Sequence, residues 1–109
     1  MTGKILGKIV GLHYGFGGYQ DAQFGLSVTL GGEGYGVSDF WGFWATRPGE
    51  HCKWTEEQQI KSFGETAMRI KEIMVEAKVD SLDKLKGAPV EITFDDGTLK
   101  EWRILKEVL

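Results

Sequence analysis

The chain has 109 residues, 13 of them Lys or Arg and 16 Asp or Glu, which gives a net charge of −3 and a pI near 5.4. A chain of this length predicts one domain, residues 1–109. Its acidic balance argues against nonspecific binding to duplex DNA, which needs a dense basic surface. The single cysteine, Cys52, excludes an internal disulfide and fits a reducing compartment, and no apolar run approaches the length of a membrane span.

The first part of the chain predicts three strands that are rich in glycine and aromatic side chains. Residues 4–14 form the first, and Gly7 and Gly11 within it indicate a bulge or a close backbone neighbour. Residues 23–30 alternate large apolar with small side chains, as a strand with one buried face does. A glycine-rich hairpin turn leads to a third strand, residues 35–45, which carries rings on both faces.

A long helix follows and extends to about Lys78. Thr55 and Gln58 have the spacing of a capping box, in which each side chain binds a backbone N–H of the first turn. Helical periodicity predicts that one apolar stripe faces the core. The stripe consists of Ile60, Phe63, Ala67, Ile70, Met74 and Ala77. A second, short helix is expected over residues 82–86.

The chain then predicts a second hairpin. Residues 89–94 alternate as a strand, and Asp96-Gly97 is a strong signal for a two-residue turn. The returning strand spans residues 99–105, and its inward-facing set changes phase before Trp102. Such a phase change predicts a β-bulge.

The order β-β-β-α-α-β-β predicts an α+β fold with about five antiparallel strands and one long helix packed on one face. One helix covers only one face of a sheet, whereas the third strand carries rings on both faces. Because large exposed apolar patches usually mark interfaces, we expect a homo-oligomer, a dimer or larger.

Glycines and rings alternate between Tyr14 and Trp54, which leaves open backbone beside ring faces. Such a surface suits a flat or phosphorylated small molecule: rings stack, glycine amides donate, and arginine binds phosphate. The same pattern is equally typical of an aromatic core or of an interface with a partner. The candidate ligand-binding residues are Tyr14, Phe16, Gly17, Gly18, Tyr19, Gln20, Asp21, Trp41, Trp44, Arg47, Lys53 and Arg103.

Motifs for catalysis or cofactor binding do not emerge. Residues 15–20 lack the third glycine and the following helix of a dinucleotide fingerprint. The histidines and Cys52 lack zinc-ligand spacing, and His51 points away from Cys52 on an extended chain. Asp39 is expected to bind a neighbouring amide. We therefore predict a non-enzymatic protein without cofactor or metal; a hydrolase that uses Asp39 or Cys52 is the least favoured alternative.

Nearly the whole chain resembles a family of small, mostly uncharacterised bacteriophage and prophage proteins. The shared segments are G-F-G-G-Y-Q-D-A (15–22), F-W-G-F-W (40–44), W-T-E-E (54–57), G-x-P-V-E-I-T-F (87–94) and T-L-K-E-W-R-I-L (98–105). The resemblance implies a phage-encoded protein that works in the host bacterial cytoplasm, and it carries no activity with it.

In that setting, small acidic oligomers are often counter-defence proteins. The first hypothesis is therefore a binding protein that sequesters a nucleotide-derived signalling molecule. The alternatives are an inhibitor that binds a host defence protein directly through its aromatic face, and an accessory protein for single-stranded nucleic acid, which fits the rings but not the charge.

Overall fold

The computed structural model describes residues 2–17, 23–44 and 55–108. In chain order the elements are β1 (Gly3–Gly17), β2 (Gln23–Gly32), β3 (Tyr35–Trp44), α1 (Glu56–Ala77), the 3-10 turn η2 (Leu82–Leu85), β4 (Pro89–Asp95), β5 (Thr98–Ile104) and the 3-10 turn η3 (Lys106–Val108). The predicted α+β class is confirmed, with a five-stranded antiparallel sheet and one long helix. The second predicted helix is the single turn η2.

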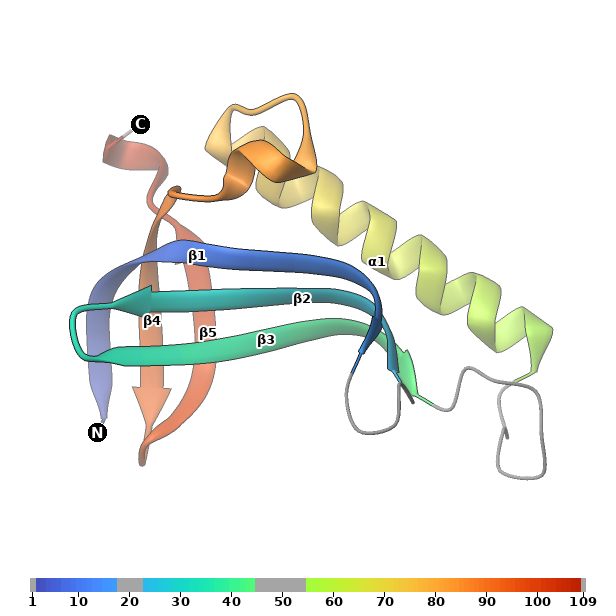
Figure 1. The fold of residues 1–109 in the computed structure, drawn as a ribbon, viewed down its shortest axis with the longest axis horizontal. Coiled ribbons are helices and arrows are strands. Elements are labelled where there is room, and N and C mark those ends of the chain that lie inside the picture. The colour runs from blue at the N-terminus through green and yellow to red at the C-terminus, as the bar shows by residue number, and fades with distance from the viewer. Residues whose placement is uncertain (1, 18–22, 45–54, 109) are drawn as a thin grey trace.

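The sheet has the order β3-β2-β1-β4-β5 and is strongly curved. Its centre is β1, which pairs with β4 through residues 3–8 and with β2 through residues 8–17. Figure 1 shows β1 turning sharply between these halves, so that β1, β2 and β3 cross in front of β4 and β5. The curvature brings the two outer strands of the sheet, β3 and β5, toward each other.

Two bulges confirm the irregularities that the sequence predicts. In β1, Ile9 pairs with Leu30 and Gly11 with Thr29, so one extra residue lies between them. In β5, a shift before residue 101 accounts for the phase change ahead of Trp102. A bulge increases local twist, and both bulges lie in strands that follow the bend of the sheet.

The hairpin turns also form where they are expected. Asp96 and Gly97 have φ values of 51° and 80°, and both positions of such a turn require positive φ. The β2–β3 turn is equally short, with Gly32 paired to Tyr35. The Asp96-Gly97 turn therefore has the length that its sequence predicts, whereas β2 continues through Gly31 and Gly32, which the sequence assigns to the turn.

Tyr35 explains why β1 has a glycine at position 7. The Tyr35 hydroxyl donates to the carbonyl of Leu6 at 2.7 Å. A Cβ on Gly7 would lie 2.6 Å from that hydroxyl, and a Cβ on Gly32 would lie equally close to the ring. The expectation of a close backbone neighbour at Gly7 is confirmed, because the Gly31 carbonyl oxygen would lie 2.8 Å from a Cβ on Gly7.

A row of glycines crosses the far end of the three-stranded layer. Gly25 of β2 pairs with Gly15 of β1 and with Gly42 of β3. A Cβ on Gly25 would collide with the carbonyl of Trp41, and one on Gly42 with the carbonyl of Phe24. The strands approach too closely here for side chains, and Figure 1 shows them bending at this end of the layer.

Helix α1 begins with the capping box that the sequence predicts. The Gln58 amide donates to Thr55 Oγ1 at 3.1 Å, and the Thr55 amide donates to Gln58 Oε1 at 2.9 Å. The helix ends at Lys78, which adopts the left-handed conformation. No helix in the described part of the chain is long and apolar enough to span a membrane.

The predicted apolar stripe of α1 is correct only in its second half. Ala77 is buried, but Ile60 and Phe63 are 63% and 40% exposed. The buried face runs instead through Ser62 and Thr66, roughly a quarter of a turn away at 100° per residue. Small side chains let the helix present this face to the sheet. Thr66 can be buried because its hydroxyl donates to the Ser62 carbonyl at 2.9 Å.

The core lies between the two crossing parts of the sheet and the second half of α1. It is mainly aliphatic, and most of its side chains are inaccessible to solvent. Its buried members are Ile9, Leu26, Val28, Leu30, Ile73, Ala77, Leu85, Val90, Ile92, Phe94, Trp102 and Ile104. The first half of α1 extends beyond this core, which is where the candidate site begins.

Candidate functional site

Four rings from three elements meet beyond the glycine row; we call Tyr14, Phe16, Phe24 and Phe63 the aromatic cluster. Phe24 is central, with ring centroids 5.7 Å from Tyr14 and 5.0 Å from Phe16, both nearly perpendicular. The Phe63 ring on α1 lies 5.6 Å from Phe24. Tyr14 and Phe16 are nevertheless 45% and 51% exposed. The cluster therefore combines defined ring orientations with an open apolar surface.

A second group of side chains closes the curved sheet. Asp39 of β3 accepts a hydrogen bond from the Trp102 indole Nε1–H of β5 at 2.8 Å, and its other oxygen accepts from the Phe40 amide at 2.9 Å. Trp41 stacks on Trp102 with ring centroids 5.7 Å apart and planes at 16°. Asp39 thus binds a neighbouring amide, as expected, and it also joins the two outer strands.

Arg69 of α1 covers this tryptophan pair. Its guanidinium carbon lies 4.8 Å from the Trp41 ring centroid and 5.9 Å from that of Trp102. The Trp41 ring is therefore in contact with both the Trp102 ring and the Arg69 guanidinium. Trp41, a candidate stacking residue by sequence, is therefore already in contact with two side chains of the protein.

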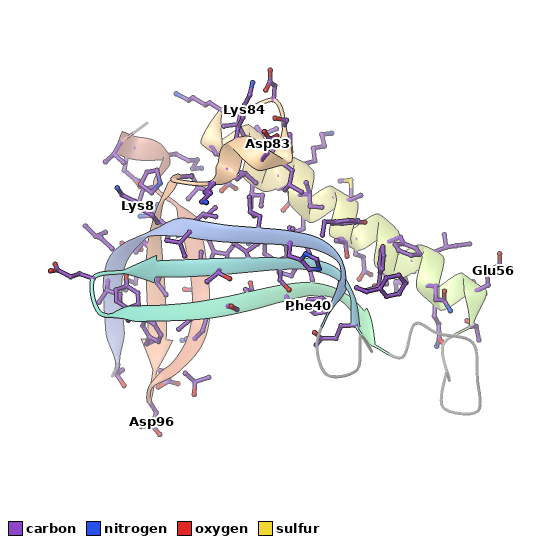
Figure 2. The ribbon with its side chains drawn as sticks, viewed as in Figure 1. Lys8, Phe40, Glu56, Asp83, Lys84 and Asp96 are labelled. Carbon is purple, nitrogen blue, oxygen red and sulfur yellow. The ribbon has the colours of Figure 1, made fainter. Side chains whose placement is uncertain are left out.

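A cavity of about 360 Å³ lies beside Arg69, between β3 and the first half of α1. Its lining includes Ser62, Glu65 and Thr66 from the helix and Phe40 and Gly42 from the strand. Figure 2 labels Phe40 on this part of β3. The polar side chains of α1 in this lining therefore lie across the cavity from β3.

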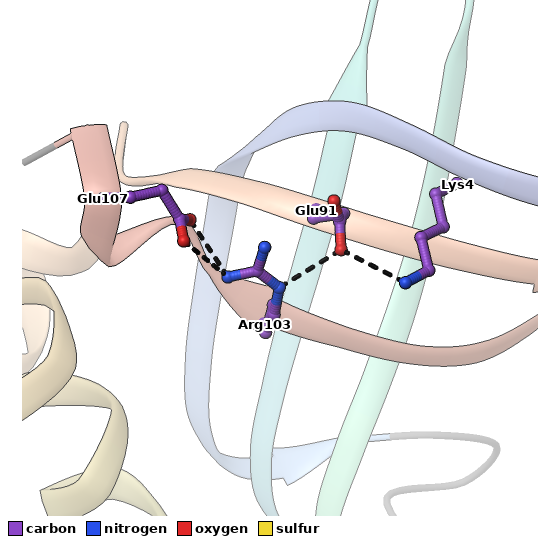
Figure 3. Close-up of polar contacts among 4 residues, drawn as sticks. All are labelled: Lys4, Glu91, Arg103 and Glu107. Carbon is purple, nitrogen blue, oxygen red and sulfur yellow. Dashed lines mark hydrogen bonds and ion pairs between the residues drawn. The ribbon is translucent and has the colours of Figure 1, made fainter.

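Arg103, a predicted anion-binding residue, lies elsewhere. Its Nε donates to Glu91 at 3.1 Å and one terminal nitrogen donates to both oxygens of Glu107, while Lys4 lies 3.8 Å from Glu91 (Figure 3). These carboxylates raise the pKa of Arg103. Because neighbours on a strand face opposite sides, Arg103 points away from Trp102. The structure therefore does not bring Arg103 to the tryptophan pair.

The remaining predicted site residues divide into two groups. Gly17 is the last residue of β1 and follows the aromatic cluster directly. Trp44 ends β3, but its side chain lies outside the described part of the structure, as do Gly18, Tyr19, Gln20, Asp21, Arg47 and Lys53. The chain segments that carry these residues connect β1 to β2 and β3 to α1.

Sequence reasoning missed Arg69, Ser62 and Thr66. Their spacing does place them on one face of a helix. We assigned the buried face by hydrophobicity, however, and so treated the polar residues of α1 as solvated. Only the packing of α1 against β3 shows that this face meets Trp41.

His13, His51 and Cys52 are the residues that the sequence offers as metal ligands or as a nucleophile with its base. His13 Nε2 lies 2.7 Å from the Phe16 carbonyl oxygen, so this ring supports the end of β1. His51 and Cys52 lie outside the described residues. Among residues 2–17, 23–44 and 55–108, no three His, Cys, Asp or Glu side chains gather closely enough to hold a metal ion.

Comparison with known proteins gives no match: no family model, no curated protein and no solved structure is significantly similar to this chain.

Proposed function

We propose that this is a non-enzymatic, phage-encoded counter-defence protein that acts in the host cytoplasm by docking on a host protein through the aromatic cluster. The observation that carries the proposal is the exposure of Tyr14 and Phe16, half-open to solvent although their rings are held in edge-to-face contacts. Rings that are already oriented lose little conformational freedom on binding, and for this reason aromatic residues dominate interface hot spots.

The surroundings of the cluster extend this apolar surface. Ile60 lies one helical turn before Phe63 on α1 and is more than half exposed. Exposed apolar residues of β1 and α1 therefore form one continuous patch, and such patches are typical of interaction surfaces. A second copy of the chain would compete with a host protein for this surface, and we propose that the protein self-associates through it when no host protein is bound. Light scattering at micromolar concentration tests it, since a monomeric mass would exclude it.

Affinity capture tests the docking proposal. The wild-type protein is compared with a Tyr14→Ser, Phe16→Ser double variant and with a Val75→Ser control, which removes a comparably exposed apolar side chain elsewhere on α1. We expect a host protein to be captured stoichiometrically by wild type and control. The double variant should bind the purified partner at least about tenfold more weakly. Equal capture by all three proteins would contradict the proposal.

Sequestration of a nucleotide-derived signalling molecule is the second candidate function. Trp41 does not favour it, because Trp102 and Arg69 already pack on that ring. The cavity beside Arg69 does favour it, because it places an arginine next to open space. Calorimetric titration of cyclic oligonucleotides and cyclic ADP-ribose-type molecules tests this function, and no heat with any of them would leave protein docking as the function.

The fate of a captured nucleotide tests the absence of catalysis. Protein loaded with such a molecule is heat-denatured, and the released compound is identified by mass spectrometry. An intact nucleotide is expected from a protein that only binds. A chemically altered nucleotide would show that the protein is an enzyme.

A further inference from the structure

The cavity between β3 and α1 has the donors of an anion site. Its volume is about 360 Å³, within the range of small-molecule sites. Its walls carry Trp41 and Gly42 from β3 and Ser62, Glu65, Thr66 and Arg69 from α1. Three of these residues present hydrogen-bond donors that the described residues leave unused.

Ser62 contributes a buried hydroxyl. The residue is only 9% exposed, and its hydrogen bond within the described structure uses the backbone carbonyl, which accepts from Thr66. Its side-chain oxygen has no partner there. Buried hydroxyls in native proteins almost always have a partner, from the protein, from water or from a ligand. An unpaired hydroxyl in a cavity wall is therefore available to an atom of a ligand or to a water molecule.

Arg69 contributes a cation whose donors are unused. The tryptophan pair supports the guanidinium from one side, with Trp41 4.8 Å away. Among the described acids, only Glu72 is close, and its carboxylate oxygen lies 3.6 Å from a guanidinium nitrogen, beyond hydrogen-bonding distance. Stacking on a ring leaves the planar edge of an arginine free, and that edge matches the oxygens of a phosphate or carboxylate.

Gly42 contributes a backbone amide. Along β3, backbone amides point alternately toward β2 and away from it, because β2 and β3 pair antiparallel. The Phe40 amide is one that points away from β2, and it binds Asp39 instead. Gly42, two residues further on, therefore also directs its N–H toward the open edge of the sheet. The cavity lies on that edge. Without a side chain, Gly42 leaves this donor accessible.

We propose that the cavity binds a small molecule that carries a phosphate group and hydroxyl donors of its own. The phosphate accepts hydrogen bonds from Arg69, the Ser62 hydroxyl and the Gly42 amide, and a hydroxyl of the ligand donates to Glu65. This acid is the reason for choosing a ligand with donors of its own, because a carboxylate in the wall repels a bare anion. The inference gives the second candidate function a site, and it rests on the geometry of the cavity alone.

Titration by NMR tests the site. Inorganic phosphate and adenosine monophosphate are added at constant ionic strength, and the Gly42 amide, Arg69 Nε–H and tryptophan indole signals are followed. We expect saturable shifts at these groups, with tighter binding of the nucleotide. Arg69→Gln should weaken both ligands at least about tenfold, and Lys71→Gln, which removes the same charge from the exposed side of α1, should change neither.

Two further variants separate binding from folding. Ser62→Ala removes a hydroxyl without a protein partner, so the melting temperature should stay the same or rise while phosphate binding weakens about fivefold. Glu65→Gln should act in the opposite direction on inorganic phosphate and tighten it, because a repulsive charge is lost. Opposite signs at two neighbouring positions do not arise from general loss of structure.

Clear outcomes would overturn the inference. It fails if neither probe produces saturable shifts at Gly42 and Arg69, or if Lys71→Gln weakens binding as much as Arg69→Gln. If adenosine monophosphate binds as expected but no signalling nucleotide gives heat, the site stands and the second candidate function falls. If a signalling nucleotide binds wild type and Arg69→Gln equally, that function stands and this site falls.

Discussion

Strand β1 runs through two regions of opposite character, the aliphatic core and the aromatic cluster. At Ile9 the side chain is fully buried in the core, whereas at Phe16 half of the side chain faces solvent. Burial of aliphatic surface stabilises a fold, and exposed rings contribute much less to stability. Under the proposed function, stability and binding would therefore be carried by separate parts of one strand, and each could be altered with little effect on the other.

The largest effect on stability should come from the core. Ile92→Ala removes a fully buried side chain from β4 and should lower the free energy of unfolding by about 2–5 kcal/mol. Ile92→Val should cost less, about 0.5–1.5 kcal/mol. Urea denaturation followed by circular dichroism measures both. A midpoint that does not change for Ile92→Ala would show that the core is misplaced.

The closure between the outer strands should be the next most sensitive point. Asp39→Ala leaves the Trp102 indole and the Phe40 amide without their acceptor and should cost about 2 kcal/mol. Asp95→Ala, at the exposed end of β4, is the control and should have little effect. If both variants unfold at the same denaturant concentration as wild type, β3 and β5 are not joined through Asp39.

The start of α1 should show a smaller effect. Thr55→Ala removes one half of the capping box and should cost about 1 kcal/mol. Thr55→Ser retains a hydroxyl in the same position and should restore most of the stability. Thermal unfolding of the three proteins provides the comparison, and identical unfolding of wild type and Thr55→Ala would argue against the cap.

The smallest effect on stability should come from the aromatic cluster. Phe16→Ala loses one edge-to-face contact with Phe24 and should cost about 0.5–1 kcal/mol. The same variant should bind the captured host protein markedly more weakly. A loss of stability as large as that of Ile92→Ala would place Phe16 in the core and remove the distinction between the two regions.

Much of this architecture is local and could therefore be predicted. Asp96-Gly97 forms its turn because both positions need positive φ, and Thr55 forms its box with Gln58 because the partner lies three positions after the cap. Alternation along β2 reports a buried face directly. The bulge before Trp102 is also local, and the sequence shows it as a change in which side chains of residues 99–105 face inward.

The candidate site was predicted only in part. Tyr14 and Phe16 do lie together and exposed, as ring faces beside glycines suggest. Within the described part of the chain, the cation beside Trp41 is Arg69 from α1, whereas Arg103 belongs to an ion-pair network on the other side of β5. Proximity in sequence favoured Arg47 and Lys53, and strand position favoured Arg103, but neither criterion includes the rotation of a helix about its axis.

The sequence by itself determined the class of the fold, its hairpins, its bulges and its helix start, because each depends on dihedral preferences or spacing within a few residues. Only the tertiary structure decided that Asp39 binds Trp102, 63 residues away, and that Arg69 covers Trp41. These contacts depend on the summed curvature of five strands and on which face of α1 meets them. Such quantities accumulate over the whole sheet, and no single segment of the chain specifies them.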